Sequence, residues 1–215
     1  MINPFRKNAK LVLSNGITFH GFSFGDTGTS VGEIVFNTGM TGYQEVITDP
    51  SYYGQILTFT YPEIGNTGIN FEDSESSKCI KGIIVRNFSS NTSNWRSTMN
   101  FDEWLVEKKI IGLYGIDTRA LVKLLRSNGS MNGVLTSEDK SVESCLKIIH
   151  QTPKMEGLNL SKVVSTKNPY LWRDVSETVF DVRKRDSESA PKLKIVAIDF
   201  GIKKSILNRL VSYRK

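Results

Sequence analysis

The sequence has few of the side chains on which nucleophilic catalysis and metal binding most often depend. Its 215 residues include two cysteines, Cys79 and Cys145, and two histidines, His20 and His150. The cysteines lie far apart and lack metal-ligand spacing, which predicts two reduced, structural thiols. Neither has the glycine-flanked turn of an activated thiol. We expect the histidines to be surface or hydrogen-bonded groups, so the sequence supplies no catalytic or metal-binding residue.

Long hydrophobic runs are also missing. No apolar stretch approaches the roughly 20 residues that a membrane-spanning helix needs. Residues 1–10 include Asn3, Pro4 and Arg6 in place of the apolar core of a secretory signal. We therefore expect a soluble, cytoplasmic protein without a membrane partner. The content of lysine, asparagine, isoleucine and serine also suits a plastid-encoded protein of the stroma.

Basic charge is present but unevenly distributed. The chain has 28 lysines and arginines against 22 acidic residues, and ten of those basic residues lie in 183–215 with only three acids. Residues 1–182 are therefore nearly neutral. Nucleic-acid binding needs clustered lysines and arginines on one face, so this distribution disfavours a nucleic-acid partner. The basic run at 183–185 stands in a serine-rich stretch and predicts a solvated linker.

The first 165 residues read as strands followed by helices. The Asn15-Gly16 pair between alternating apolar residues predicts an opening hairpin of 10–13 with 17–24. Apolar runs predict further strands at 34–36, 56–60, 80–85 and 110–116, the third of them buried on both faces. Caps and apolar spacing predict helices at 101–109, 118–128 and 142–149. The sequence thus predicts a mixed α/β chain whose residues 1–165 form a β-rich domain covered by helices.

The pattern changes after this domain. Residues 166–192 lose periodicity, apart from a possible short pairing of Leu171-Trp172 with Val179-Phe180, and are predicted to be a linker. Residues 193–199 predict a buried strand, and residues 202–211 an amphipathic helix. Because one strand and one helix cannot form a covered sheet, we expect 193–215 to begin a second, incomplete domain that is mobile or sticky in isolation.

Three polar stretches are candidates for recognition. The long loop 37–52 contains Gly39, Gly42 and the turn-forming Asp49-Pro50-Ser51, and we expect it to be held in one shape for binding. The loop 25–32 lacks the ending of a phosphate-binding loop and precedes a strand. The acids Glu72, Asp73 and Glu75 have no further ligand beside them, which predicts a solvated surface loop rather than a metal site.

Motifs throughout the chain resemble the small, glutamine-hydrolysing subunit of carbamoyl-phosphate synthetase. They cover essentially the whole chain but only part of the family protein. The motifs, in order, are Phe36-Asn37-Thr38, Met40-Thr41-Gly42-Tyr43-Gln44-Glu45, Thr48-Asp49-Pro50-Ser51-Tyr52, Thr60-Tyr61-Pro62-Glu63-Ile64-Gly65-Asn66, Gly115-Ile116-Asp117-Thr118-Arg119, Gly157-Leu158-Asn159-Leu160 and Val196-Ala197-Ile198-Asp199-Phe200-Gly201.

The resemblance implies a swivelling β/β/α fold for residues 1–165. It also implies that 193–215 are the first strand and helix of a doubly wound class I glutamine amidotransferase domain. The complete subunit hydrolyses L-glutamine and passes ammonia to a large subunit. That partner combines ammonia with bicarbonate, using ATP and magnesium, to make carbamoyl phosphate for arginine and pyrimidine biosynthesis. No cofactor is then expected in this chain.

One site residue follows from the resemblance. In the family, the serine of the Thr-Asp-Pro-Ser-Tyr motif reaches across the domain boundary to the glutamine site, which assigns Ser51 here as a glutamine-binding residue. Ser51 could instead only stabilise the Asp49-Pro50 turn by local hydrogen bonding. The family's catalytic Cys, His and Glu belong to the part of the second domain after Lys215, so this chain alone is expected to be inactive. The alternative is a catalytically inactive module that binds the large subunit.

Overall fold

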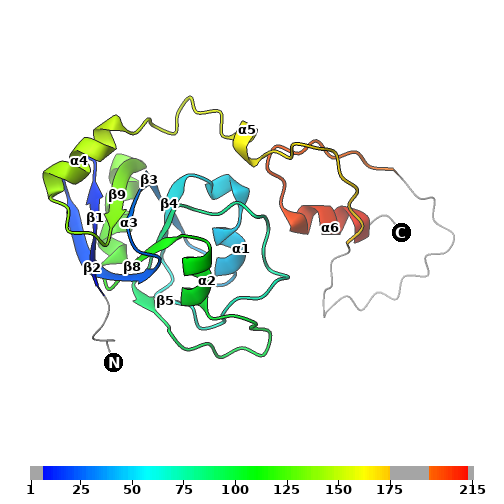
Figure 1. Cartoon of the computed structure of the whole chain (residues 1–215), viewed down its shortest axis with the longest axis horizontal. Coiled ribbons are helices and arrows are strands. Elements are labelled where there is room, and N and C mark those ends of the chain that lie inside the picture. Colours follow the sequence, from blue (N-terminus) through cyan, green and yellow to red (C-terminus); the bar gives the residue numbers. More distant parts are fainter. Residues whose placement is uncertain (1–6, 175–193, 213–215) are drawn as a thin grey trace.

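The computed structural model describes residues 7–174 and 194–212 (Figure 1). Its helices and strands, in chain order, are β1 (Asn8–Leu13), β2 (Thr18–Gly25), β3 (Thr29–Asn37), α1 (Tyr43–Ile47), the 3-10 turn η1 (Pro50–Tyr52), β4 (Gln55–Phe59), β5 (Glu63–Ile64), β6 (Gly82–Ile84), β7 (Asn87–Phe88), α2 (Phe101–Glu107), β8 (Ile111–Tyr114), α3 (Thr118–Asn128), β9 (Met131–Thr136), α4 (Val142–Gln151), α5 (Ser161–Val164) and α6 (Lys204–Ser212).

The strands form a closed barrel in the order β1-β2-β8-β6-β4-β3-β9, and β9 pairs back with β1. The neighbours β3, β4, β6 and β8 run parallel to one another, whereas the remaining barrel pairs are antiparallel. Outside the barrel, β5 and β7 form a separate parallel pair. Closure gives every barrel strand two partners and so leaves no free edge for association with another sheet. The predicted mixed α/β class is confirmed, with the β-rich part in the form of a barrel.

The predicted opening hairpin is confirmed. Gly16 adopts φ of 84°, a conformation that glycine reaches without strain, and the Asn15 side-chain oxygen accepts the Ile17 N–H at 3.1 Å. This turn sets the register in which Leu11 faces Phe19 across β1 and β2. Local turn chemistry therefore fixes the first two strands of the barrel.

Alternation along the strands divides the core into two main clusters. Ile56 and Ile84 belong to the cluster that collects apolar residues from most barrel strands together with Leu121 of α3. Their neighbours Leu57 and Ile83 belong to a second cluster with residues of α1 and α2. All four strand residues are fully buried, which confirms the prediction that the run around β6 is covered on both faces.

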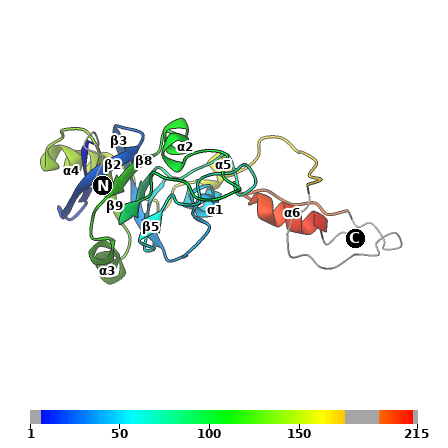
Figure 2. The same cartoon turned by 90° about the horizontal axis from the view of Figure 1, so that it is seen from below.

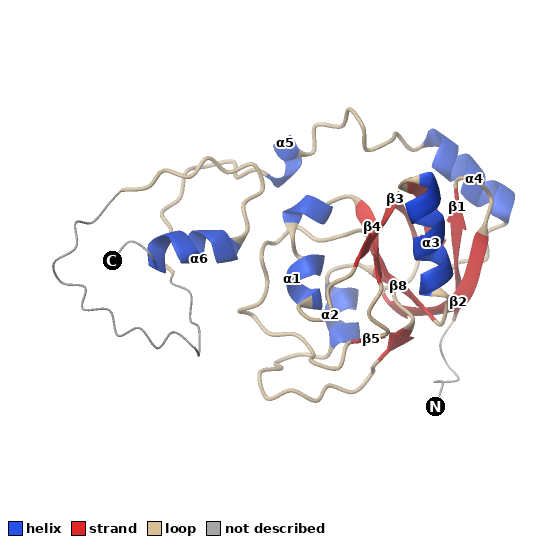
Figure 3. Ribbon diagram, turned by 180° about the vertical axis from the view of Figure 1, so that it is seen from behind, coloured by secondary structure: helices blue, strands red, loops and turns tan. Residues whose placement is uncertain are grey.

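The helices begin where their caps predict. The side chains of Asn100 and Asp117 accept the N–H groups of Asp102 and Ala120 at 2.8 and 2.9 Å, at the starts of α2 and α3. Figure 3 shows α3 and α4 around the barrel, with α1 and α2 on the side nearer α6. No helix in the described ranges combines the length and apolarity needed to cross a membrane.

Two loop predictions need correction. The loop predicted at 25–32 is shorter, because β3 begins at Thr29, which pairs with Thr136 of β9. The loop predicted over 37–52 contains α1 and η1. Tyr43 and Ile47 of α1 are buried against the barrel, so packing stabilises a helix whose local sequence gives only a weak signal.

The strand predicted over 193–199 is wrong for the residues that the structure describes. Residues 194–199 are extended without a sheet partner, and Val196 and Ile198 are 89% and 77% exposed. A strand needs a neighbouring strand to satisfy its backbone, and none lies beside this segment in the described part of the chain. The following helix is confirmed as α6. Residues 166–174 have no helix or strand, and Val179-Phe180 lie outside the described residues.

Candidate functional site

Ser51 lies in the middle of η1, with its side chain exposed. Asp49 caps this short helix, because its side-chain oxygen accepts the Ser51 N–H at 2.9 Å. Pro50 occupies the first position, where its fixed φ suits a helix start and no N–H is needed. The turn is therefore held by Asp49 and Pro50, and the Ser51 hydroxyl stands at the surface.

The C-terminal segment docks on this turn. The Lys203 ammonium lies 3.1 Å from the second carboxylate oxygen of Asp49. Beside it, Gly201 adopts φ of 100° and packs closely against Pro50 and Val164, leaving no room for a side chain. Figures 1 and 2 both place α6 beyond α1 and α5, to one side of the barrel. The Thr48–Tyr52 motif is thus the contact between the barrel and the segment leading to α6.

Electrostatics at this contact favour the ionised pair. Burial alone would raise the pKa of Asp49, but hydrogen bonds from the backbone and side chain of Ser51 and the nearby Lys203 together hold that pKa below its usual value. The Asp49 side chain is 12% exposed and that of Lys203 is 39% exposed, so water screens the pair in part. The hydrogen bond to Asp49 correspondingly raises the pKa of Lys203.

Glu75 provides a second connection to the same segment. Its carboxylate accepts the Ser205 N–H at 2.9 Å and its carbonyl accepts the Lys204 N–H at 3.1 Å, at the start of α6. A negative charge at a helix N-terminus is favourable, since the free N–H groups there are electropositive. The Glu75 N–H is donated to the Thr48 hydroxyl, also at 2.9 Å, which links this contact to the Ser51 motif.

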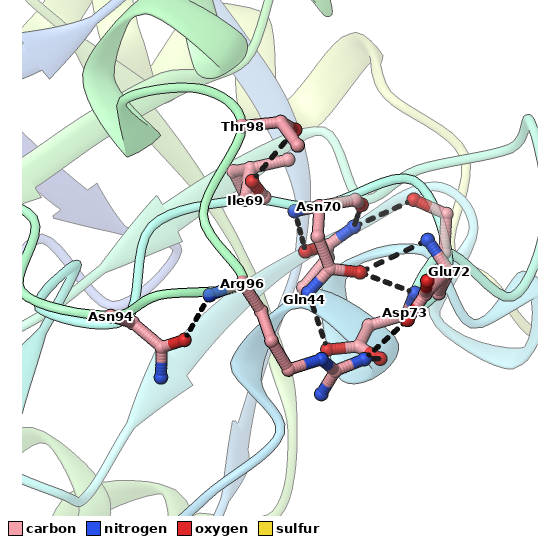
Figure 4. A network of polar contacts seen from close by, with 9 residues as sticks. Gln44, Ile69, Asn70, Glu72, Asp73, Asn94, Arg96 and Thr98 are labelled. Atoms are coloured by element: carbon pink, nitrogen blue, oxygen red, sulfur yellow. Dashed lines mark hydrogen bonds and ion pairs between the residues drawn. The ribbon is translucent and has the colours of Figure 1, made fainter.

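The acidic stretch predicted as a solvated loop is more ordered than expected, because it is tied to α1. The Gln44 side chain accepts the Asn70 N–H at 3.0 Å and donates to the Ser74 hydroxyl at 2.8 Å. Arg96 reaches both Glu72 and Asp73, at 2.8 and 2.7 Å (Figure 4). This network holds the chain that carries Glu75 in position to cap α6.

The segment around α6 also contacts the chain that follows α5. The Asp199 carboxylate accepts the N–H groups of Gly201 and Ile202, and the Trp172 indole donates to Asn208 of α6 at 2.8 Å. Between residues 166–172 and α6 lies an apolar cavity of about 280 Å³, lined in part by Leu207 and Val211. The predicted linker therefore packs along α6 in its described part.

The thiols of Cys79 and Cys145 have the properties of structural rather than reactive groups. Burial raises the pKa of both Cys79 and Cys145, so each is protonated at neutral pH and is a poor nucleophile. His20 is exposed on β2, which carries neither cysteine. His150 shares α4 with Cys145, but the histidine is exposed whereas the cysteine is buried. The described residues contain no group of three or more His, Cys, Asp or Glu side chains arranged to hold a metal ion.

Sequence reasoning predicted the turn that carries Ser51 but missed Asp49, Glu75 and Lys203 as the groups that join the two parts of the chain. Asp49 carries the readable signal of a residue that precedes proline in a turn. Lys203 is 154 positions away from Asp49, and no local pattern connects the two.

The family model described as carbamoyl-phosphate synthase small chain, CPSase domain, matches residues 11–135. The carbamoyl phosphate synthase small chain of Synechocystis sp. is 54% identical over 209 residues, which cover 96% of this chain and 54% of that protein. The chloroplastic small chain of Arabidopsis thaliana is 46% identical over 209 residues, covering 96% of this chain and 48% of that protein. The chain spans about half the length of the curated relatives it matches.

Proposed function

We propose, since the chain belongs to the carbamoyl-phosphate synthase small-chain family, that it supplies the N-terminal half of a glutamine-hydrolysing subunit. The complete subunit releases ammonia from L-glutamine and delivers it to a large subunit, which makes carbamoyl phosphate for arginine and pyrimidine biosynthesis. ATP and magnesium act in the large subunit, so this chain binds neither.

The observation that carries the proposal is the docking of residues 199–205 on the Ser51 motif. Asp49 and Glu75 hold this segment through Lys203 and Ser205, so the exposed Ser51 hydroxyl stands beside the boundary between the two parts of the chain. A residue in that position can contribute one hydrogen bond to a ligand held mainly by the second part. This supports Ser51 as one wall of the glutamine site.

The exposed apolar residues of the segment support a further domain. Val196, Ile198 and Phe200 alternate along an extended stretch and are 89%, 77% and 71% exposed. We propose that this stretch becomes the first strand of a doubly wound amidotransferase domain, where neighbouring parallel strands would pair with it and helices would cover it. The barrel domain would then be of the swivelling β/β/α type.

Catalysis belongs outside this chain in our proposal. Glutamine hydrolysis of this type needs a thiolate and a base, and the raised pKa values of both thiols speak against either as the nucleophile. The chain alone is therefore expected to release no glutamate from glutamine. We place the subunit in the cytoplasm or, as for the chloroplastic plant relatives, in the plastid stroma.

A chimeric small chain tests the proposal. Residues 1–212 of this chain would replace the matching half of the Synechocystis relative, to be purified with that relative's large subunit. We expect co-purification and glutamine-dependent synthesis of carbamoyl phosphate. A folded chimera that binds the large subunit but uses only ammonia would contradict the role in glutamine use. A folded chimera that does not bind the large subunit would contradict the partnership.

A further inference from the structure

A basic cavity of about 310 Å³ opens between α3 and the chain that follows β4 and β6. Its volume is at the lower end of the roughly 300 to 1,000 Å³ typical of small-molecule sites. The residues that line it are Thr60, Pro62, Arg86, Thr118, Arg119, Val122, Lys123 and Arg126. None of them takes part in the docking of residues 199–205, so the cavity is separate from the contact at Ser51.

The cavity lies where parallel strands end. The strands β4, β6 and β8 are adjacent and parallel, and the lining residues follow the end of each: Thr60 after β4, Arg86 after β6 and Thr118 after β8. The Gly115 N–H donates to the Arg86 carbonyl at 2.9 Å and holds two of these connections together. Ligands in α/β folds bind at the carboxyl ends of parallel strands, where the N-terminus of the next helix favours an anion.

Four cations face this cavity without compensating carboxylates. Arg119, Lys123 and Arg126 repeat at helical spacing on α3, and Arg86 adds a fourth positive charge. Throughout residues 7–174 and 194–212, none of the four forms an ion pair. The four side chains are exposed, so water and salt screen their mutual repulsion, and a bound anion would reduce it further.

The carboxylates nearest in sequence do not fill this role. Glu63 accepts a hydrogen bond from the Asn87 side chain, and Asp117 accepts the Ala120 N–H at the start of α3. Both acids are thereby held by other partners. In the part of the chain that the structure describes, no carboxylate forms an ion pair with a lining cation, so these cations can contact an anionic ligand.

A hydroxyl in the cavity is compatible with the same ligand chemistry. Thr118 lines the cavity and is 3% exposed as a residue, but its hydroxyl oxygen is not one of the fully buried oxygens that lack a partner in the described ranges. The hydroxyl therefore reaches the cavity, where an oxygen of a bound anion would accept its proton in place of water. Thr118 is thus a donor next to Arg119, at the start of α3.

Apart from Thr60, the remaining lining residues are apolar. Pro62 and Val122 line the cavity together with the cations. We propose that the cavity binds a small phosphorylated organic molecule. Its phosphate group contacts Arg119, Lys123 and the Thr118 hydroxyl, because guanidinium groups suit the geometry and charge of a phosphate dianion. Its organic part packs against Pro62 and Val122. This site is independent of the proposed role in glutamine use.

Calorimetric titration of the 215-residue chain at constant ionic strength tests the proposal, with phenyl phosphate, inorganic phosphate and benzoate as probes. We expect saturable binding of phenyl phosphate, about tenfold weaker binding of inorganic phosphate, which lacks the apolar part, and the weakest binding of benzoate, which has a single charge. Thr118→Val keeps the side-chain shape and removes one hydrogen bond, so it should lower the affinity for phenyl phosphate about three- to tenfold.

A pair of charge-reversed variants controls for general electrostatics. The double variant Arg119→Glu with Lys123→Glu should lower the affinity for phenyl phosphate by at least about a hundredfold. Lys154→Glu with Lys167→Glu changes the net charge equally at exposed positions away from the cavity, and should change the affinity less than about twofold. All four side chains are exposed, so both variants are expected to fold.

Three results would overturn the proposal. Equal losses in the two double variants would show binding to net charge alone. If benzoate bound as tightly as phenyl phosphate, the phosphate group would not be the feature that the cavity recognises. If the wild-type protein showed no saturable binding of phenyl phosphate or inorganic phosphate, the cations would instead be assigned to contact with an acidic segment of a protein partner.

Discussion

The barrel and the segment 194–212 contain similar apolar residues but place them differently. In the barrel, Leu57 and Ile83 on neighbouring strands are fully buried, whereas Val196 and Ile198 in the extended segment are largely exposed. The barrel strands have partners on both sides, and residues 194–199 have none among the described residues. Burial of an apolar strand therefore depends on the strands beside it more than on its own sequence.

The largest expected difference between the two regions is in stability. Leu57→Ala would leave a cavity in the core and should lower the free energy of unfolding by about 2 to 5 kcal/mol. Val196→Ala removes side-chain atoms that already face solvent, and should change it by less than about 0.5 kcal/mol. Urea denaturation followed by circular dichroism measures both. A loss of more than 1 kcal/mol for Val196→Ala would show that the segment is buried in solution.

The same comparison explains what the sequence could predict. The hairpin at Asn15-Gly16 and the caps at Asn100 and Asp117 are local, and each gives an element close to its predicted start. The amphipathic spacing of α6 is local as well. Local chemistry therefore sufficed for the hairpin and the longer helices.

The features that sequence reasoning missed depend on distant partners. The start of β3 at Thr29 needs β9, whose Thr136 is its partner. The same holds for the site: η1 could be predicted from Asp49 and Pro50, but its contact with Lys203 required the fold. A predicted strand at 194–199 was wrong because periodicity indicates what a segment can bury but not whether a partner is present.

The next prediction concerns the docking of the segment 194–212 on the barrel. Gly201→Ala would put a methyl group 2.7 Å from the Val164 side chain and 3.4 Å from Pro50, at φ of 100°. The clash and the backbone strain should loosen α6 by about 1 to 3 kcal/mol, which accelerates exchange of its amide hydrogens roughly five- to hundredfold. Barrel amides should keep their rates.

A matched variant separates contact from strain in that experiment. Gly157 has a similar φ of 82°, but a Cβ there would meet nothing within 4 Å. Gly157→Ala should therefore leave exchange in α6 unchanged. Equal effects of the two substitutions, or unchanged exchange in Gly201→Ala, would mean that the Pro50–Gly201 contact does not hold the segment.

The Asp49–Lys203 pair predicts that docking depends on pH. Against the effect of burial, hydrogen bonds from Ser51 and, after them, the docked Lys203 hold the pKa of Asp49 below its usual value. The part that Lys203 adds is linked to docking, so this contribution is complete above the usual pKa and is lost as the pH falls through the lowered one. The pKa of Lys203 is raised, so its contribution is lost only as the pH rises beyond the usual range of lysine. Amide hydrogen exchange in α6, corrected for the intrinsic pH dependence of exchange, should report undocking in acid.

A substitution that removes the titrating group tests this assignment. Asp49→Asn keeps an oxygen that can accept the Ser51 N–H but has no charge for Lys203. Docking in this variant should be weaker at neutral pH, and the difference from the wild type should disappear in acid. An acid transition of unchanged size in Asp49→Asn would assign the dependence to another group, with Glu75 at the start of α6 the first alternative.

The smallest expected effect concerns Ser51, which lies at the contact between the two regions. One neutral hydrogen bond contributes roughly 0.5 to 1.5 kcal/mol. In the chimeric subunit, Ser51→Ala should therefore lower kcat/KM for glutamine about two- to tenfold while ammonia-dependent synthesis is unchanged. Ser127→Ala, at an exposed position of α3, is the control and should change neither reaction. If Ser51 only stabilised the Asp49-Pro50 turn, Ser51→Ala would lower the rate of synthesis with both glutamine and ammonia, or with neither. Equal effects on glutamine and ammonia would thus remove Ser51 from the glutamine site and leave it as part of the docking surface.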